Sequence, residues 1–404
     1  MAADAGSLRI DWADGQMPVL RSIRERFAVQ RPLDGVKVGA CLHVTAETAN
    51  LVRTLAAGGA QVALCAANPL STQDDVVAVL GEEMLVRARR ATDPRPGQAE
   101  VAAWDPHVTL DDGADLVALL HEREALPDGF LGATEATTTG LVRVRALELR
   151  CPVLALNEAR TERVFNDHYG TGQSTLDGIL RATNVLLAGR TVVVLGYGFT
   201  GRGVASRARG AGAQVIICEV DPIAALEARM EGFEVMPSLD AAARGDVFIP
   251  VTGSPSVLGA EHFARMKDGA TLANAGHFDV EIDLGALEDA AHERTQVLPL
   301  VESFVVGGRR LNLLAQGRVV NLAAGEGHPA EIMDISFAVQ ALAVEHLVAH
   351  AGELAPGVHA APAEIDREVA RLKLAALGVA IDELTPAQEA YRHSWDGVAP
   401  QGAG

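Results

Sequence analysis

Apolar runs alternate with helix-compatible stretches through the first 160 residues of the chain. Each run has the continuous apolar character of a strand that is buried on both faces, and stretches with helical spacing, such as 46–57, separate them. The predicted strands span 36–43, 60–66, 108–113, 129–135 and 152–158. This alternation predicts an α/β fold with a doubly wound parallel sheet, preceded by a charged helix at about 17–29.

A second set of apolar runs follows a capped amphipathic helix that we place at 174–189 and expect to be a connector beside a hinge. These runs span 192–195, 214–218, 247–253 and 270–276. A long helix is expected to begin near Pro329, and two short helical stretches and a Gly/Ala/Pro tail follow it. The polar segment 87–100 is predicted to be a loose loop. The chain is therefore expected to form two Rossmann-type parallel-sheet domains with a small C-terminal extension.

The glycine-rich sequence GYGFTG joins the run at 192–195 to a helical stretch. Gly196 permits a tight turn, Gly198 lets the backbone approach a pyrophosphate, and Gly201 lets helix and strand pack closely. Glu219 lies 23 residues after the first glycine, at the end of the next run, and can accept bonds from both ribose hydroxyls. The alternative is a glycine turn that binds nothing. The context of strand, helix and acid favours a dinucleotide site, with NAD rather than NADP.

Composition narrows the class of protein. A chain of 404 residues with 49% hydrophobic residues suggests two globular domains. The net charge of −19 argues against a nucleic-acid partner, because no Lys/Arg-rich run compensates for it. No apolar run of membrane-spanning length and no leader pattern are evident, so we expect a cytoplasmic protein. The four cysteines form no CxxC pair, so neither a metal site nor a disulfide framework is predicted.

Polar residues cluster where the predicted strands of the first sheet end, and ligands of such sheets bind beyond the carboxyl ends of the strands. Ordinary structural roles remain open for these residues: a buried histidine for His43, turn residues for Asp111 and Asp112, and helix caps for the threonines. The cluster comprises His43, Thr45, Glu47, Asn68, Ser71, Thr72, Gln73, Asp74, Asp111, Asp112, Glu135, Thr137, Thr138, Thr139 and Asn157.

Several segments together resemble the S-adenosylhomocysteine hydrolase family. They are CLHVTAETA, NPLSTQDD, DDGADL, TTTG, YGTGQSTLDGILRATNVLLAG, GYGFTGRG, NAGHFDVEID and VVNLAAGEGHPAEIMDISF, and they cover nearly the whole chain after residue 36. The resemblance implies a substrate-binding domain at 1–165 and 328–360, an NAD-binding domain at 166–327, and a C-terminal oligomerisation or tail segment at 361–404. It also implies an adenine nucleoside substrate and a homotetramer.

The chemistry that this resemblance implies depends on tightly bound, recycled NAD. Oxidation of the sugar 3′-hydroxyl to a ketone acidifies the C4′ proton, the C5′ substituent then leaves, and the hydride is returned after water adds. The resemblance assigns catalytic positions to His43, Asp112, His277, Glu162 and Asn166. It assigns substrate contacts to Thr45, Glu47, Gln73, Ala136, Asp167, His328 and Met333. It assigns cofactor contacts to Thr137, Thr138, Thr139, Gly196, Gly198, Gly201, Glu219, Asn274 and Asn321.

The sugar-reading positions depart from the family pattern. The family has glutamate where this chain has Ala136, lysine where it has Glu162, and aspartate where it has Asn166, and Asp167 replaces an asparagine. The segment 87–100 replaces an aromatic-rich WxGET stretch, and the tail resembles that of the short-tailed subgroup. Exchanging lysine for a negative glutamate is expected to reverse the local charge of the cleft, an effect of several kcal/mol. The small Ala136 leaves space beside the sugar.

These departures make the leading hypothesis a dehydratase or lyase that acts on an adenine nucleoside with a modified sugar, for example in nucleoside antibiotic biosynthesis. The first alternative is an authentic S-adenosyl-L-homocysteine hydrolase that releases adenosine and homocysteine. The second is a non-catalytic NAD-binding regulatory paralogue.

Overall fold

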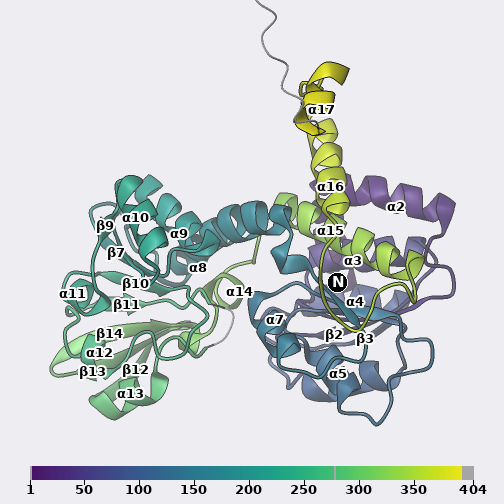
Figure 1. Ribbon diagram of the computed structural model, residues 1–404. Coiled ribbons are helices and arrows are strands. Elements are labelled where there is room, and N and C mark those ends of the chain that lie inside the picture. Colours follow the sequence, from purple (N-terminus) through teal and green to yellow (C-terminus); the bar gives the residue numbers. More distant parts are fainter. Residues whose placement is uncertain (1, 277–278, 394–404) are drawn as a thin grey trace, which may run out of the picture.

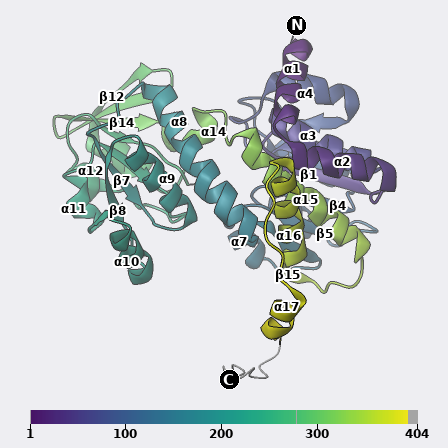
Figure 2. The same cartoon turned by 90° about the horizontal axis from the view of Figure 1, so that it is seen from above.

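The computed structural model describes residues 2–276 and 279–393, which form two lobes that lie side by side (Figure 1). Each lobe is built around one sheet. Helix α8 (Gly172–Thr183) runs between the lobes, and α16 (Ala363–Ala376) and α17 (Pro386–His393) project away from the first lobe (Figures 1 and 2). The predicted α/β architecture with two parallel-dominated sheets is confirmed.

The sheet of the first lobe has seven parallel strands in the order β15-β6-β5-β4-β1-β2-β3. The continuous apolar runs become its buried central strands, because helices cover both faces. Its strands are β1 (Lys37–Leu42), β2 (Gln61–Ala66), β3 (Leu85–Arg87), β4 (Val108–Asp111), β5 (Gly132–Glu135), β6 (Pro152–Ala155) and β15 (Gly357–Ala360). Its other helices are α1 (Ala2–Gly15), α2 (Pro18–Gln30), α3 (Ala46–Ala57), α4 (Asp74–Glu83), α5 (Arg95–Ala103), α6 (Asp115–His121), α7 (Thr138–Arg145), η1 (Leu156–Glu158), η2 (Glu162–Thr171) and α15 (Ala330–Ala349).

The sheet of the second lobe has eight strands in the order β12-β13-β14-β11-β10-β7-β8-β9. The strands from β9 to β14 in this order are parallel, and β13 and β12 add an antiparallel edge. Its strands are β7 (Thr191–Leu195), β8 (Gln214–Cys218), β9 (Glu234–Val235), β10 (Val247–Pro250), β11 (Ala270–Leu272), β12 (Ala291–Leu298), β13 (Val301–Val306) and β14 (Arg309–Leu314). Its helices are α9 (Phe199–Gly210), α10 (Pro222–Met230), α11 (Ser238–Ala242), α12 (Ala260–Phe263), α13 (Leu284–Ala290), η3 (Ala315–Gly317) and α14 (Val320–Ala323).

Both sheets reverse their strand order at a central strand. In the first sheet β1 lies between β2 and β4, and in the second β7 lies between β8 and β10. A crevice opens beyond the carboxyl ends of the two strands at such a switch point, and ligands bind there. The topology therefore predicts that the residues that follow β1 and β4, and those that follow β7 and β10, contact ligands.

Two element predictions were wrong. The helix predicted at 174–189 ends at Thr183, because Asn184 adopts a left-handed conformation (φ 51°) that caps it six residues early. The loop predicted at 87–100 is interrupted by α5, which starts at Arg95 with Pro96 in its first turn, a position where proline is tolerated.

Helix α15 is long and apolar enough to cross a membrane by length and composition alone, although no such span was predicted. It packs against α2, α3, α16 and η2, and most of its side chains are buried in the first lobe. Its apolar character is that of a helix at the centre of a protein core.

Candidate active site

His43 and Asp112 lie at the switch point of the first sheet, directly after β1 and β4. The His43 backbone N–H binds the Asp112 carboxylate and partly offsets the effect of burial, which raises the pKa of Asp112 to about 7. An acid with a pKa near neutrality can exchange protons at physiological pH. The structure thus brings together the two residues that were assigned to proton handling.

The His43 ring is held by Ser71, which follows β2. Ser71 Oγ lies 2.7 Å from His43 Nδ1 and 3.0 Å from the carbonyl oxygen of Asn68. The single hydroxyl proton is donated to the carbonyl, so the hydroxyl accepts a bond from Nδ1–H of the ring. This arrangement selects the tautomer with the lone pair on Nε2, as a general base requires.

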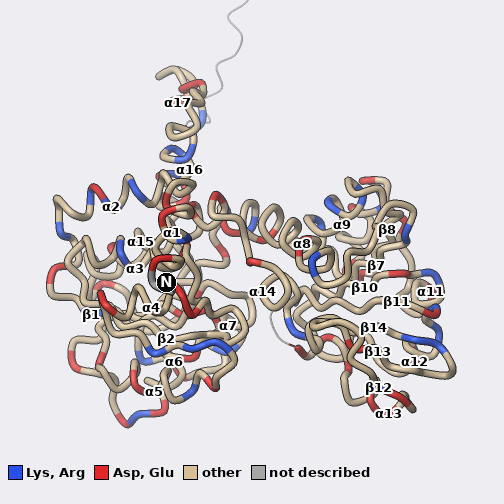
Figure 3. Tube along the Cα trace, turned by 180° about the vertical axis from the view of Figure 1, so that it is seen from behind, with Lys and Arg blue, Asp and Glu red and all other residues tan. Residues whose placement is uncertain are grey.

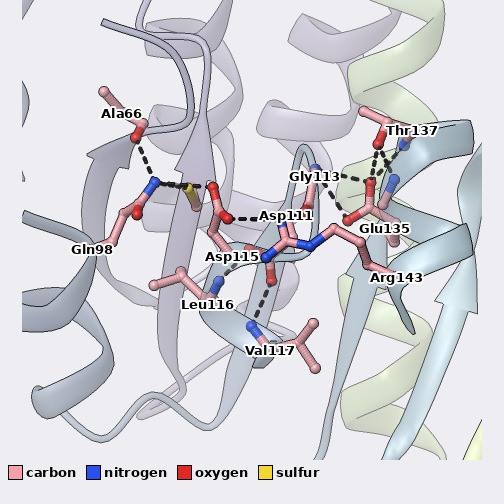
Figure 4. A network of polar contacts seen from close by, with 12 residues as sticks. Ala66, Gln98, Asp111, Gly113, Asp115, Leu116, Val117, Glu135, Thr137 and Arg143 are labelled. Carbon is pink, nitrogen blue, oxygen red and sulfur yellow. Dashed lines mark hydrogen bonds and ion pairs between the residues drawn. The ribbon is translucent and has the colours of Figure 1, made fainter. Parts of the chain in front are cut away.

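Glu135 ties the Asp112 loop to the start of α7, as Figure 4 shows. Its fully buried carboxylate accepts bonds from Gly113 N at 3.1 Å and from Thr137 N and Oγ1 at 2.7 and 2.6 Å. Burial raises the pKa of Glu135 to about 8. Ala136 follows Glu135 at the carboxyl end of β5. The bonds of Glu135 therefore fix the backbone at Ala136, although the alanine side chain is small.

Three further positions assigned to the sugar lie on η2, which is π-helical. π-Helical segments are rare in proteins, and those that occur are frequently found at functional sites. Asp366 of α16 caps the start of η2 by accepting bonds from the backbone N–H groups of Arg160 and Thr161 at 2.8 and 3.1 Å. Glu162 on η2 is 3% exposed, and its Oε2 accepts a bond from Ser336 of α15 at 3.0 Å.

Burial corrects the expectation that Glu162 reverses the charge of the cleft. Desolvation raises its pKa to about 8, helped by repulsion from Asp167 and Asp112, so the group is mostly protonated at pH 7. The positive charge implied by the resemblance is lost, but no full negative charge replaces it. Desolvation also raises the pKa of Asp167 to about 7.

Replacing Glu162 by glutamine is expected to stabilise the protein at alkaline pH. The unfolded chain ionises this carboxyl at the ordinary pKa of 4.5, whereas the folded protein keeps its proton up to about pH 8. The native state therefore loses stability as pH rises through this interval, by roughly 4 kcal/mol. The measurement is the free energy of unfolding between pH 5 and 9, in which the advantage of Glu162→Gln should grow with pH. The exposed Glu148→Gln provides the control, and an advantage that does not depend on pH would contradict the argument.

His328 precedes α15 and connects η2 to the second lobe. Its Nδ1 lies 2.6 Å from Asn166 Oδ1, and its Nε2 lies 3.1 Å from Thr171 Oγ1 and 3.4 Å from Asn321 Nδ2. Burial lowers the pKa of His328 to about 4, so the ring is neutral and these bonds fix its tautomer. Asn166 therefore contacts His328.

The glycine loop after β7 has the shape that a dinucleotide requires. Gly196 has φ +105°, and a Cβ atom at Gly201 would lie 2.1 Å from the Gly196 carbonyl oxygen. No atom lies within 4 Å of where a Cβ at Gly198 would stand, so that side of the loop is open. The Glu219 carboxylate accepts a bond from Tyr197 N at 2.5 Å at the same crevice.

Two buried polar atoms among the predicted cofactor contacts also fit a bound cofactor. Asn321 Oδ1 and Thr139 Oγ1 have no hydrogen-bond partner within 2–276 and 279–393, although such atoms are rarely left unpaired. Asn274 follows β11 in the chain and is buried, and its Oδ1 accepts a bond from Gly276 N at 2.9 Å. Thr137 caps α7, and Thr138 Oγ1 donates to Asn157 Oδ1 at 2.9 Å. The residues present can hold a dinucleotide.

Several residues that were assigned to substrate contacts line the space between the lobes. Thr45 caps α3, Glu47 lies in its first turn, and Gln73 Oε1 accepts a bond from Ala46 N at 3.1 Å. Glu47, Gln73 and His328 line a cavity of about 680 Å³. Met333 packs against the core of the first lobe. His277 lies outside the described residues, and its predicted role stays a prediction.

Sequence reasoning missed the residues that hold the site in place. Ser336, Thr171, Ser174 and Asp366 each bond to a site residue or to η2. For Ser336 a signal existed, because a polar side chain within an otherwise apolar helix is expected to have a buried partner. For Asp366, no nearby sequence feature points to η2.

Comparisons with known proteins agree with this geometry. Two family models match: S-adenosyl-L-homocysteine hydrolase over residues 1–128, and its NAD-binding domain over residues 167–327. Adenosylhomocysteinase from Aquifex aeolicus is 55% identical over 98% of this chain and 97% of its own length. S-inosyl-L-homocysteine hydrolase from Methanosarcina mazei is 50% identical over 97% of this chain and 98% of its own length.

Among solved structures, a dipicolinate synthase from Bacillus halodurans covers 79% of this chain and 99% of its own, with a TM-score of 0.50. Its 15% identity supports the fold alone. The match to the NAD-binding domain indicates NAD as the cofactor. With both family models matched and relatives above 50% identity along nearly the whole chain, this protein belongs to the S-adenosyl-L-homocysteine hydrolase family.

Proposed function

We propose that the protein is an NAD-dependent hydrolase that cleaves S-adenosyl-L-homocysteine into adenosine and homocysteine. The observation that carries this proposal is the His43–Ser71 pair beside Asp112 at the switch point, in a chain 55% identical to an adenosylhomocysteinase over nearly its full length. The comparisons favour this function over the modified-sugar dehydratase that the sequence departures suggested, because they give that activity no support.

The site residues have the chemistry that the reaction needs. When bound, NAD supplies the hydride acceptor for a sugar hydroxyl and returns the hydride afterwards. The Nε2 lone pair of His43 takes the proton from the sugar carbon next to the oxidised one, and the C5′–S bond breaks to release homocysteine. Asp112, with a pKa near 7, exchanges protons with the leaving group and with the water that adds.

The hydroxyl that loses its hydride also needs a base. Glu162 Oε1 is a buried oxygen with no hydrogen-bond partner among the residues that the structure describes, and Asp167 lies beside it on η2. Their raised pKa values of about 8 and 7 make the ionised forms effective bases near neutral pH. Glu162 and Asp167 can take over the role of the family's lysine and aspartate, although Asp167 stands one position after that aspartate, so the departures do not by themselves remove the function.

The test is a comparison of substrates with the purified holoenzyme. Homocysteine release is measured with a thiol reagent for S-adenosyl-L-homocysteine and S-inosyl-L-homocysteine, and alkene formation is measured for a sugar-modified adenine nucleoside that carries no amino acid. We expect kcat/KM for the adenosyl substrate to exceed the others at least about tenfold, a difference of roughly 1.4 kcal/mol. Faster cleavage of the inosyl compound would show that the substrate carries the base of inosine rather than adenine. The absence of thiol release from both compounds would refute the proposed hydrolase activity.

A second candidate, elimination from a sugar-modified adenine nucleoside, is favoured by one observation. Ala136 occupies the position after Glu135 that the family fills with a second glutamate, and its side chain is only partly buried. An alkene product from the modified nucleoside, with little thiol release from S-adenosyl-L-homocysteine, would select this candidate. Under it, the combined variant Ala136→Glu, Glu162→Lys and Asn166→Asp should gain thioether hydrolysis.

A further inference from the structure

A cavity of about 500 Å³ opens beside Ser71 and is lined by residues of both lobes. The first lobe contributes Ser71, Thr72 and Gln73, and the second contributes the segment 322–326. Ser71 holds the His43 ring, so this cavity adjoins the group that takes the proton from the sugar. A substituent that extends from C5′ of a nucleoside needs a space in this position.

Three arginines line the cavity, and two of them are already neutralised. Arg9 pairs with Asp75 at 3.2 Å and with Glu326 at 3.3 Å. Arg181 pairs with Asp177 and Glu326, both at 3.0 Å. These cations therefore have little capacity for another anion.

Arg90 differs from the other two arginines. It forms no ion pair within the described part of the chain, and its Nη1 donates to the Thr72 carbonyl oxygen at 3.4 Å. That contact anchors one nitrogen at the cavity wall and leaves the rest of the guanidinium for a planar anion such as a carboxylate.

A carboxylate lines the same cavity and contacts the backbone of Arg90. Asp74 Oδ1 accepts a bond from the Arg90 backbone N–H at 2.8 Å, and both side chains line the cavity. Figure 3 shows the same interspersion of Lys and Arg with Asp and Glu over both lobes. Groups of opposite charge that line one cavity are complementary to a zwitterion, which the α-amino and α-carboxyl groups of an amino acid form.

We infer that Arg90 is a specificity residue that binds the α-carboxylate of the amino-acid portion of the substrate. The inference rests on the proposed function and deepens it, because it distinguishes a nucleoside that carries an amino acid from one that does not. Arg90 lies on the segment 88–94, whose sequence departs from the family pattern, so this contact belongs to the present chain.

The experiment measures the condensation direction, in which adenosine and a thiol are joined with loss of water. Homocysteine is compared with 3-aminopropane-1-thiol, which lacks the carboxylate, for the wild type, Arg90→Ala and the control Arg89→Ala. Arg89 is an exposed neighbour that does not line the cavity. We expect Arg90→Ala to raise KM for homocysteine about fivefold, the size of an exposed charge pair, with kcat and KM for adenosine unchanged.

The outcomes separate this inference from the proposed function. KM for the thiol without a carboxylate should be the same in the wild type and Arg90→Ala, and the effect on homocysteine should shrink as salt is added. Equal rises with both thiols, or no rise with either, would overturn the role of Arg90 while the hydrolase stands. A wild-type enzyme that neither releases nor incorporates homocysteine would instead refute the proposed function itself.

Discussion

Replacing His43 with alanine is expected to lower kcat by about 10²- to 10⁴-fold, the range for loss of a general base. The reason is geometric: Ser71 Oγ, at 2.7 Å from Nδ1, fixes the ring in the tautomer that carries its lone pair on Nε2. The amount of NAD that stays bound through purification and the melting temperature should match those of the wild type. Absorbance of the reduced nicotinamide should still appear on adding nucleoside, whereas exchange of the C4′ hydrogen with solvent should stop.

Two further variants make the His43 prediction specific. Ser71→Ala keeps the ring but removes the acceptor for Nδ1–H, so an intermediate loss of about tenfold is expected. His292→Ala removes an exposed histidine on the β12 edge strand and should change nothing. Wild-type C4′ exchange in His43→Ala would show that another residue removes the proton.

Substituting valine for Gly201 is expected to abolish retention of NAD and to destabilise the second lobe. A Cβ there would lie 2.1 Å from the Gly196 carbonyl oxygen, and backbone cannot move aside without breaking the turn between β7 and α9. Gly198→Val has a different expected signature, because no protein atom lies within 4 Å of its Cβ position and its φ of −72° suits any residue. It should leave the melting temperature of the apoprotein intact while weakening NAD binding about 100-fold, or roughly 2.7 kcal/mol.

Gly210→Ala is the matched control for these two variants. It lies at the end of the same helix, α9, with no atom within 4 Å of the added carbon. The readouts are NAD content after purification, affinity by calorimetry, and thermal unfolding of the apoprotein. Equal NAD content in Gly198→Val and the control would contradict the assignment of the open side of the loop to the cofactor.

The strand positions and the cofactor motif follow from local sequence. The runs at 38–42, 62–66 and 192–195 are apolar throughout because both faces of a parallel sheet are covered, and this pattern can be recognised without knowing the neighbouring strands. Helix α1 and the consecutive strands β12, β13 and β14 were not predicted. They carry mixed patterns, and their placement depends on other segments, because β14 joins the sheet through β11 and α1 packs against α3 and α4.

The amino-acid sequence by itself determined the two-sheet architecture, the glycine loop and the placement of His43 and Asp112 at strand ends, because these depend on residue type and spacing over short distances. Only the tertiary structure decided the protonation of Glu162, the bond between Asn166 and His328, and the ion pairs that leave Arg90 as the unpaired cation within the described cavity wall. Glu162 meets Ser336 across 174 residues and Asn166 meets His328 across 162. The physical reason is that desolvation and charge pairing depend on what surrounds a group in space, and those surroundings come from segments that are remote along the chain.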